Sequence, residues 1–330
     1  MSDAPLFSVV VPTIGRPGKL LPLLEGLGRQ TLPRERFEIV VVFDGVPPPP
    51  DATAALERAS ARVVMLAARS GPPIARNAGA SAARGAFLVH TDDDVTPEPD
   101  WLANAAARLA ADPALDVIEG VTRKPGGRAV RIRGDEERQY ILCNLIVRRA
   151  MFERVGGFHT GYYEPATGLF FREDADLGWS LERIGANVAR GTDVVVVHPE
   201  ENPRYADPLR WTQRYVMDAL LAARFPREFR DRIEVHRLGG LVVRRPIVRA
   251  SFGFVLGVLI ALAALLARQP RIAAAAGILA ALCFVPVWAK WRFDPRRLPV
   301  FLLVPFGLVW ARLRGVPRAR RIHARRAGAQ

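Results

Sequence analysis

The sequence predicts an α/β fold, with a mostly parallel sheet flanked by helices and transmembrane helices following it at the C-terminal end. Short apolar strands alternate with helices between Phe7 and Asp92, which is the pattern of a parallel sheet covered on both faces. Acidic residues directly follow two of these strands, at Asp44 and at Asp92–Asp94. Two long apolar runs stand near the end of the chain. Together these observations predict a soluble domain with a ligand crevice, joined to a membrane region.

The expected elements of the first half are runs of mainly apolar residues separated by turn-forming Pro, Gly and Asp residues. The expected strands are Phe7–Val11, Phe37–Phe43, Arg62–Ala67 and Ala86–Val89. The expected helices are Leu20–Leu27, Asp51–Ala61 and Asn77–Arg84. Ligands of such sheets bind beyond the carboxyl ends of the strands, so we expect Asp44 and the Asp92–Asp94 cluster to share one crevice.

The second half of the chain is less regular. A basic, glycine-rich stretch over Gly120–Asp135 is typical of a loop, and Gln139–Val147 has the composition of a strand. We expect a helix over Glu173–Ile184 and a late strand over Asp193–Val197. Leu209–Phe225 places apolar residues along one helical face, which suits either a helix on a membrane surface or one packed on the soluble domain.

The positive charge of the chain belongs to its C-terminal part. The whole chain has a net charge of +14. From Arg244 to Gln330 there are 16 basic residues and a single acid, Asp294, whereas the preceding residues carry 31 basic and 32 acidic residues. A nucleic-acid-binding protein would carry its positive charge on the folded domain, so the charge pattern argues against that class. Two cysteines, Cys143 and Cys283, offer no disulfide framework and indicate a reducing compartment.

The same C-terminal part contains the apolar runs. Residues 252–267 and 272–289 are each near the length of a membrane-spanning helix, and a tight turn over Arg268–Arg271 separates them. A third apolar segment, residues 298–313, is short and contains two prolines and an arginine. We therefore expect a soluble domain over residues 1–200, an amphipathic or interfacial helical linker over 201–243, and a membrane region with a basic tail over 244–330.

The distribution of charge predicts how this membrane region is oriented. The chain opens without a signal peptide, so the residues before Arg244 are expected in the cytoplasm. A third full span would place an arginine-rich tail outside, against the positive-inside tendency. We predict two spans and an interfacial or re-entrant third segment in the inner (plasma) membrane. The soluble domain and the C-terminus then face the cytoplasm, with the tail against anionic lipids.

Three consecutive aspartates, Asp92, Asp93 and Asp94, form the most informative cluster of the soluble domain. Carboxylates packed this closely repel one another, which indicates that a cation is held there. Side chains two apart on a strand point to the same side, so Asp92 and Asp94 are expected to converge on one ion while Asp93 faces away. Replacing Asp93 is therefore expected to have the smallest effect of the three. An acidic turn that merely caps the next helix is the alternative interpretation.

Six segments occur in an order that carries more information than any one of them. They are Ser8–Pro17 (SVVVPTIGRP), Val40–Gly45 (VVVFDG), Gly71–Gly79 (GPPIARNAG), His90–Trp101 (HTDDDVTPEPDW), Gly156–Phe158 (GGF) and Phe171–Trp179 (FREDADLGW). In this order the segments resemble the motifs of family 2 glycosyltransferases of the membrane-anchored bacterial type, over roughly Phe7 to Pro199. The resemblance implies an A-type glycosyltransferase fold with a nucleotide-binding sheet, a nucleotide-sugar donor, a divalent metal (Mg²⁺ or Mn²⁺) and inversion at the anomeric carbon.

The resemblance also assigns residues to the donor. Pro12, Thr13 and Asp44 match the family positions that bind the nucleoside, although Asp44 beside a glycine also suits a plain turn. Arg76 and Asn77 are placed at the start of a helix, where an arginine adds to a helix N-terminus suited to phosphate oxygens. A simple helix cap explains Asn77 nearly as well.

The metal and the catalytic base follow from the later motifs. The family's Asp-x-Asp pattern maps onto the triple aspartate, with Asp94 expected to ligate the metal and Asp92 to contact the ribose or the metal. His198 matches a position where some relatives place a ligand, and an imidazole suits Mn²⁺ better than Mg²⁺. Asp174 matches the base of inverting transfer and Glu173 is the second candidate, although acids are common in a first helical turn. The family often has an acid after the GGF segment, where this chain has His159.

Several functions remain to be weighed. The leading prediction is transfer of sugar to a lipid-linked or cell-surface glycan, and the alternatives are a polyprenyl-phosphate glycosyl carrier synthase and a membrane scaffold without catalysis. Gly18 and Lys19 echo a phosphate-binding P-loop, but the first glycine and the final hydroxyl of that motif are missing. Two spans are too few to build a polysaccharide channel, which argues against a synthase that exports its own product.

Overall fold

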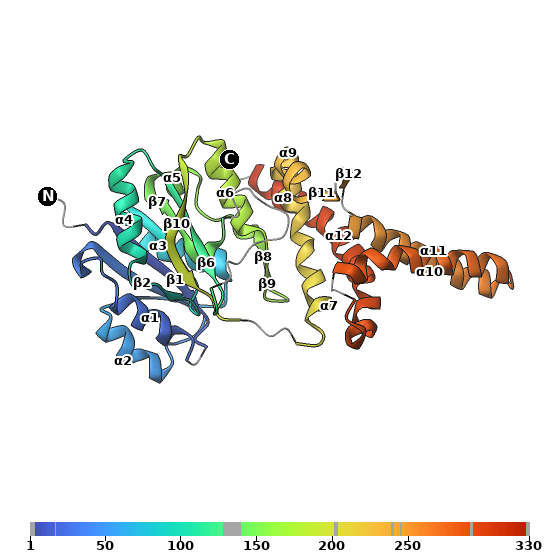
Figure 1. The fold of residues 1–330 in the computed structure, drawn as a ribbon, viewed down its shortest axis with the longest axis horizontal. Coiled ribbons are helices and arrows are strands. Elements are labelled where there is room, and N and C mark those ends of the chain that lie inside the picture. The colour runs from blue at the N-terminus through green and yellow to red at the C-terminus, as the bar shows by residue number, and fades with distance from the viewer. Residues whose placement is uncertain are drawn as a thin grey trace. The chain divides into compact units, whose positions relative to one another are not determined.

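The computed structural model describes residues 4–16, 18–127, 140–200, 204–238, 241–244, 246–290 and 293–327 (Figure 1). The chain divides into two compact units, Met1–Glu201 and Asn202–Gln330, and each is described by itself. The boundary between the two units follows Glu201.

An eight-stranded sheet forms the centre of the first unit, in the order β3-β2-β1-β4-β7-β6-β10-β5. Its strands are β1 (Phe7–Thr13), β2 (Phe37–Asp44), β3 (Arg62–Leu66), β4 (Phe87–His90), β5 (Thr96–Pro97), β6 (Val117–Arg123), β7 (Leu145–Arg148) and β10 (Val188–Val197). Parallel pairs join β3, β2, β1 and β4, and also β6 and β10. β7 runs antiparallel between β4 and β6, and β5 pairs antiparallel with β10. The expected mostly parallel sheet is confirmed.

Helices cover both faces of this sheet. They are α1 (Leu20–Gly28), α2 (Pro50–Arg58), α3 (Pro72–Ala82), α4 (Trp101–Ala111), α5 (Arg149–Arg154) and α6 (Glu173–Arg183). On one face, side chains of α1, α2 and α4 join alternate residues of β1 and β2 in a single core. On the other face Ala75 of α3 packs on Val40 and Val42. A Cβ at Gly79 would lie 2.5 Å from Val10 Cγ1, so a glycine there lets α3 lie close to the sheet.

The parallel strands bring the candidate residues to one edge of the sheet. β1 pairs in register with β2 on one side and with β4 on the other, so their carboxyl ends are neighbours. Thr13 and Asp44 end the first two strands, and the triple aspartate follows the third after a single residue. All three strands are buried along nearly their whole length, which fixes the direction in which these ends point.

Several element boundaries differ from the expected ones. Helix α3 begins at Pro72, because a proline suits the first helical position, and not at Asn77. β6 continues to Arg123, so the loop expected over Gly120–Asp135 starts later, and residues 128–139 lie outside the described residues. β7 is shorter than the expected strand, since a 3₁₀ turn over Leu142–Asn144 precedes it. β10 begins earlier, at Val188, and strand β3 is a mostly exposed edge and not a buried strand.

The second unit is mainly helical, with an antiparallel pair of strands, β11 (Val235–Leu238) and β12 (Leu241–Arg244). Short helices α7 (Asp207–Thr212), η4 (Gln213–Met217) and α8 (Asp218–Arg224) replace the single helix expected over Leu209–Phe225. Long helices follow as α10 (Pro246–Leu266), α11 (Pro270–Lys290) and α12 (Leu298–Ala327). α10 and α11 form a hairpin, visible as the paired orange helices in Figure 1. A Cβ at Gly253 would lie 2.6 Å from Cys283 Sγ, so the hairpin depends on close approach at glycine.

All three long helices are long and apolar enough to cross a membrane. The outer faces of α10 and α11 expose large apolar side chains, including Leu256, Leu259, Ile278 and Leu282. The turn between the two helices lies where the sequence places it, around Arg268. The third apolar segment is not a short separate piece, because it forms the first half of the continuous helix α12.

Candidate active site

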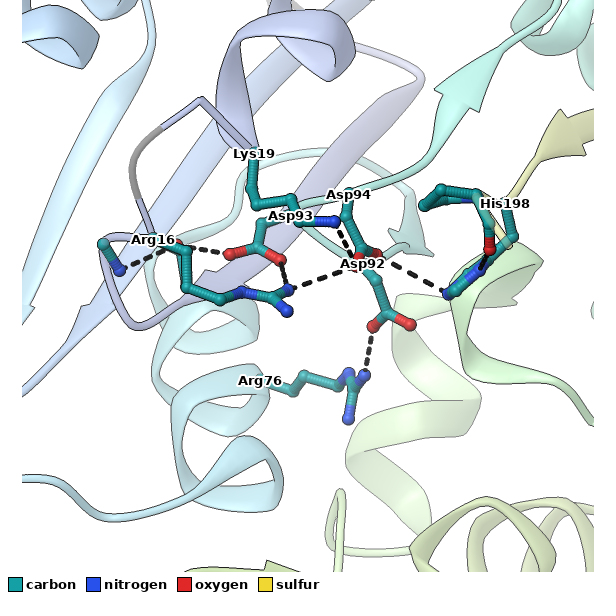
Figure 2. A network of polar contacts seen from close by, with 10 residues as sticks. Arg16, Lys19, Arg76, Asp92, Asp93, Asp94 and His198 are labelled. Atoms are coloured by element: carbon teal, nitrogen blue, oxygen red, sulfur yellow. Dashed lines mark hydrogen bonds and ion pairs between the residues drawn. The ribbon is translucent and has the colours of Figure 1, made fainter. Parts of the chain in front are cut away.

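The triple aspartate lies in a turn directly after β4 (Figure 2). Strand β4 ends at His90, so the alternation of side chains along a strand does not extend to these residues. The expectation that Asp92 and Asp94 point one way and Asp93 the other therefore needs correction. Asp92 pairs with Arg76, whereas Asp93 and Asp94 share Arg16 and Asp94 also faces His198.

Asp92 faces the buried guanidinium of Arg76. Arg76 Nη2 donates to Asp92 Oδ1 at 2.7 Å, and Arg76 Nη1 lies 3.9 Å from Glu173 Oε1. Arg76 sits in the second turn of α3, so its position owes nothing to the helix N-terminus that the sequence analysis invoked. Its Nε and Nη1 groups are buried and have no hydrogen-bond partner among the described residues. Burial raises the pKa of Asp92, and the Arg76 charge opposes that rise.

Asp93 has firm partners, which corrects the expectation that it is the cheapest of the three to lose. Asp93 is 4% exposed, and its Oδ2 accepts the Thr13 hydroxyl at 2.6 Å. Its Oδ1 accepts from Arg16 Nη2 at 2.5 Å, and the Thr13 oxygen in turn accepts the N–H of Gly15. Asp93 thus holds the loop after β1 against the turn after β4. Removing it would leave buried polar groups without partners.

Asp94 lies among three basic side chains. Arg16 Nη2 is 3.3 Å and Lys19 Nζ 3.8 Å from Asp94 Oδ2, while His198 Nε2 is 3.6 Å from Asp94 Oδ1. His198 Nδ1 is 2.9 Å from the carbonyl oxygen of Pro199. With the proton on Nδ1 donated to that carbonyl, the lone pair of Nε2 faces Asp94.

This pair of donor atoms fits a divalent cation. A carboxylate oxygen and an imidazole nitrogen separated by about the distance between two neighbouring ligands suit Mn²⁺ in particular. In the described part of the chain no three His, Cys, Asp or Glu side chains group closely enough to hold a metal by themselves. A cation on Asp94 and His198 would therefore take its other ligands from a bound anion and water, as Mg²⁺ and Mn²⁺ commonly do at phosphates.

Asp44 and Asn77 each hold backbone groups of another segment. The two Asp44 oxygens accept the N–H groups of Ser70 and Gly71 at 2.6 and 2.8 Å. Asn77 exchanges two hydrogen bonds with the backbone of Phe158, at 2.9 and 2.8 Å. These contacts fix the loop before α3 and the GGF segment. The predicted contacts of Pro12, Thr13, Asp44 and Asn77 with a nucleotide stay predictions.

Glu173 and Asp174 open helix α6. The preceding residue, Arg172, has a left-handed backbone with φ of 77°, which sets the direction in which the helix starts. Asp174 Oδ1 accepts the N–H of Ala175 at 2.7 Å, while Glu173 Oε2 is buried without a partner among the described residues. Burial raises the pKa of both carboxyls. The negative charge of Asp174 raises the pKa of Glu173 further. Carboxyls with raised pKa values beside a crevice are typical of acid–base sites.

Three residues of this region were not singled out as site residues. His90 is fully buried, and the centre of its ring lies 5.3 Å from the centre of the Phe152 ring and 5.0 Å from that of Phe158. Burial and the nearby Arg76 charge lower its pKa to about 3, so its ring is neutral. Arg16 and Lys19 contact the aspartates from the loop after β1. Basic residues directly after the first strand were the available signal for these two.

A model of the family described as glycosyl transferase family 2 matches residues 8–178, which is more than half of the chain. The chain belongs to this glycosyltransferase family. The matched residues include all the motifs from β1 to the start of α6, and His198 lies beyond them.

Relatives of this glycosyltransferase are found among curated proteins. Glycosyltransferase AglE of Haloferax volcanii is 24% identical over 213 residues, covering 57% of this chain and 69% of AglE. The succinoglycan biosynthesis protein ExoO of Rhizobium meliloti is 32% identical over 151 residues, covering 42% of this chain and 41% of ExoO.

Solved structures share the fold. The mannosyltransferase PcManGT of Pyrobaculum calidifontis, solved with GDP-Man and Mn²⁺, has a TM-score of 0.53 at 19% identity, covering 95% of this chain and 87% of PcManGT. S. aureus TarS has a TM-score of 0.51 at 20% identity, covering 68% of this chain and 43% of TarS. The expected A-type glycosyltransferase fold is confirmed, and the protein is an enzyme that transfers sugar.

Proposed function

We propose that this glycosyltransferase transfers a sugar from a nucleotide-sugar donor to a lipid-linked or cell-surface glycan, with a divalent metal and with inversion at the anomeric carbon. The observation that supports this most is Arg76. A buried guanidinium with N–H groups that lack partners among the described residues costs about 1–3 kcal/mol for each unsatisfied group. An anionic ligand between Asp92 and Glu173 would complete those hydrogen bonds.

The donor diphosphate is the anion that suits this place. Arg76 contributes positive charge from helix α3, and Arg16 and Lys19 contribute positive charge from the loop after β1. The Asp92 side chain is 34% exposed, so it can accept a ribose hydroxyl. PcManGT and TarS have each been solved with a nucleotide sugar, which supports a donor of this class.

Asp94 and His198 are the residues that would hold the metal. A divalent cation bound there neutralises negative charge that develops on the departing diphosphate. Asp92, two residues away, would serve as a further oxygen donor. The positive side chains of Arg16 and Lys19 lie beside this site and share the same task.

Asp174 acts as the base. Its carboxylate takes the proton of an acceptor hydroxyl, the acceptor oxygen bonds to the anomeric carbon, and the bond from that carbon to the diphosphate breaks. A raised pKa makes the ionised carboxylate a stronger base than an ordinary aspartate. Glu173 lies 3.9 Å from Arg76 at the start of α6, and burial together with the neighbouring Asp174 charge raises its pKa.

The acceptor is a glycan built at the membrane. ExoO is named for succinoglycan biosynthesis, which supports a polysaccharide acceptor. Two helices with exposed apolar faces support a membrane anchor that keeps the enzyme near lipid-linked material. We place the catalytic domain and the C-terminus in the cytoplasm, because the basic residues of the second unit gather at the ends of the apolar helices that return there.

The packing of α12 supports an anchor with two spans. Small residues at every fourth position, Gly307, Ala311, Gly315 and Ala319, form one face of the helix. A Cβ at Gly307 would lie 2.2 Å from Thr212 Oγ1 and one at Gly315 would lie 2.6 Å from the Val216 carbonyl, so this face packs on the α7–α8 segment. That segment carries charged residues that do not belong in hydrocarbon. The remaining part, residues 298–306, rises about 14 Å as a helix, against ~30 Å for the bilayer core.

Release of nucleoside diphosphate tests the proposal. The purified full chain is incubated with a panel of sugar nucleotides and a glycolipid acceptor, with Mn²⁺, with Mg²⁺ or with a chelator. We expect acceptor-dependent release that requires the metal. Asp174→Asn should lower turnover by at least about 10²-fold while donor binding is kept. Asp176→Asn is the matched control, because Asp176 accepts the Tyr162 hydroxyl at 2.8 Å and an amide oxygen can do the same.

The outcomes discriminate between the functions. Product inverted at the anomeric carbon on a glycan supports the proposal. A product on a polyprenyl phosphate with no glycan would instead identify a carrier synthase. No release from any donor, with the chain folded, would indicate a scaffold.

A further inference from the structure

The second unit contains a cavity of about 190 Å³ at the open end of the α10–α11 hairpin. Ile247 of the first turn of α10 and Lys290, the last residue of α11, both line it. Val304 and Leu308 of α12 form another wall. The cavity therefore lies at the level where two apolar helices of a membrane hairpin enter and leave the bilayer.

The polar side of the cavity comes from α7 and η4. Lys290 Nζ donates to the Tyr215 hydroxyl at 3.3 Å and lies 5.5 Å from the centre of the Tyr215 ring. The guanidinium carbon of Arg214 lies 5.7 Å from the centre of the Trp211 ring. Trp and Tyr are enriched at the membrane–water interface, and Lys and Arg there face lipid headgroups. Lys290 and Arg214 are the basic residues in the described lining of the cavity.

The size of the cavity limits what it can hold. Pockets for drug-sized ligands have volumes of about 300–1,000 Å³. The cavity is smaller, so it admits a phosphate group with a few carbon atoms and not a whole nucleotide sugar. Its walls change from basic and aromatic at Lys290 and Tyr215 to aliphatic at Ile247, Val304 and Leu308, which matches the junction between the headgroup and the chains of a lipid.

We propose that this cavity binds the phosphate of an anionic glycerophospholipid. Lys290 and Arg214 neutralise the phosphate, the Tyr215 and Trp211 rings pack on the glycerol, and the acyl chains follow the apolar side of Ile247 and Val304 into the bilayer. The excess of basic residues in this part of the chain complements such lipids. A lipid bound there would connect α7 and η4 to the start of α10 and to the end of α11.

The inference rests on the proposed membrane insertion of α10 and α11, but not on the sugar-transfer chemistry. Membranes that contain the full chain are therefore washed with alkaline carbonate first. Release of the chain by this wash would contradict insertion, whereas retention of the chain allows the lipid site to be tested separately.

The test measures which lipids remain bound to the full chain by native mass spectrometry in a mild detergent. The probes are phosphatidylglycerol, phosphatidylcholine, a polyprenyl phosphate and inorganic phosphate. Lys290→Gln with Arg214→Gln removes both charges of the cavity. Arg268→Gln with Arg271→Gln removes the same number of charges at the opposite end of the hairpin and is the matched control. Each charge lost from the cavity should weaken phosphatidylglycerol binding about fivefold.

We expect about 25-fold weaker phosphatidylglycerol binding in the cavity variant, and less than about twofold change in the control. Equal losses in both variants, equal retention of phosphatidylcholine, or displacement by inorganic phosphate would each overturn the proposal. Stronger retention of the polyprenyl phosphate than of phosphatidylglycerol would overturn the assignment to bulk phospholipid. Ile247→Phe fills the cavity without removing charge. It should also exclude the lipid, and it carries the test if the charge variant does not fold.

Discussion

Replacing Arg76 by methionine is the sharpest perturbation of the candidate active site. Methionine keeps much of the volume of the side chain and removes its hydrogen bond to Asp92 at 2.7 Å and its charge near Glu173. Hydrogen bonds to charged groups contribute about 1.5–3 kcal/mol each. Two Arg76 nitrogens, Nε and Nη1, are buried and have no hydrogen-bond partner among the described residues, and we propose that they bond to the donor. Losing both bonds should cost about 3–6 kcal/mol of transition-state stabilisation, or roughly 10²–10⁴-fold in kcat/KM.

The assay follows nucleoside diphosphate release at varied donor concentration, together with the Kd of the nucleoside diphosphate. Arg148→Met is the matched control. Arg148 also pairs with an aspartate, Asp116, at 2.8 Å and lies 4.7 Å from the centre of the Phe87 ring, but it is not part of the aspartate turn. The control should lose stability and keep kcat/KM within about twofold, since Arg148 touches no site residue.

Arg76→Lys separates charge from hydrogen-bond geometry. Lysine keeps the charge without the fork of donors, so we expect activity between that of the wild type and that of the methionine variant. The reasoning would be refuted if Arg76→Met kept kcat/KM within threefold, or if it lost activity no more than Arg148→Met does.

Three further predictions follow from the same structure. Because burial raises the pKa of Asp174 and the base must be ionised, kcat/KM should fall as the pH drops through a value above the ordinary 3.8, and a pH profile whose acidic limb lies at or below 3.8 would contradict this. His198→Ala should weaken activation by Mn²⁺ more than activation by Mg²⁺, by about 10-fold in metal affinity, as measured by metal titration of turnover, and equal loss for both ions would exclude a ligand role. Gly315→Leu should break the contact between α12 and η4, because even a Cβ would lie 2.6 Å from the Val216 carbonyl, and limited proteolysis should then cut the α7–α8 segment faster than in Gly277→Leu, whose site is open.

The fold could be predicted because the apolar runs of β1, β2 and β4 have only one stable environment. Strands without a polar side need cover on both faces, and helices alternating with them supply it. Prediction failed where a local pattern was ambiguous. Pro72 starts α3 earlier than Asn77 would suggest, because the intervening residues are as compatible with a loop as with a helix.

The acidic members of the candidate site could be predicted, but Arg16 and Lys19 and the pairing of the charged groups could not. The order of the motifs identified Asp92, Asp94, Asp174 and His198 as candidates. Which carboxylate pairs with which basic side chain depends on the backbone of a turn, and no residue pattern specifies that backbone. For this reason the prediction for Asp93 was wrong. The contacts of Asp93 with Thr13 and Arg16 come from the far end of β1, about eighty positions earlier in the chain.

The turn of the α10–α11 hairpin bears on how this protein reaches the membrane. α10 ends at Leu266 and α11 begins at Pro270, so the connection between the two helices is very short. If the hairpin inserts as proposed, only the tip with Arg268 and Arg271 passes through the bilayer, and no folded segment has to be translocated. At about 2.5–3.5 kcal/mol for an arginine at the bilayer centre, the crossing of two such residues is a modest barrier against two long apolar helices. Insertion can then follow the folding of the catalytic domain, as a single step in which both helices enter together.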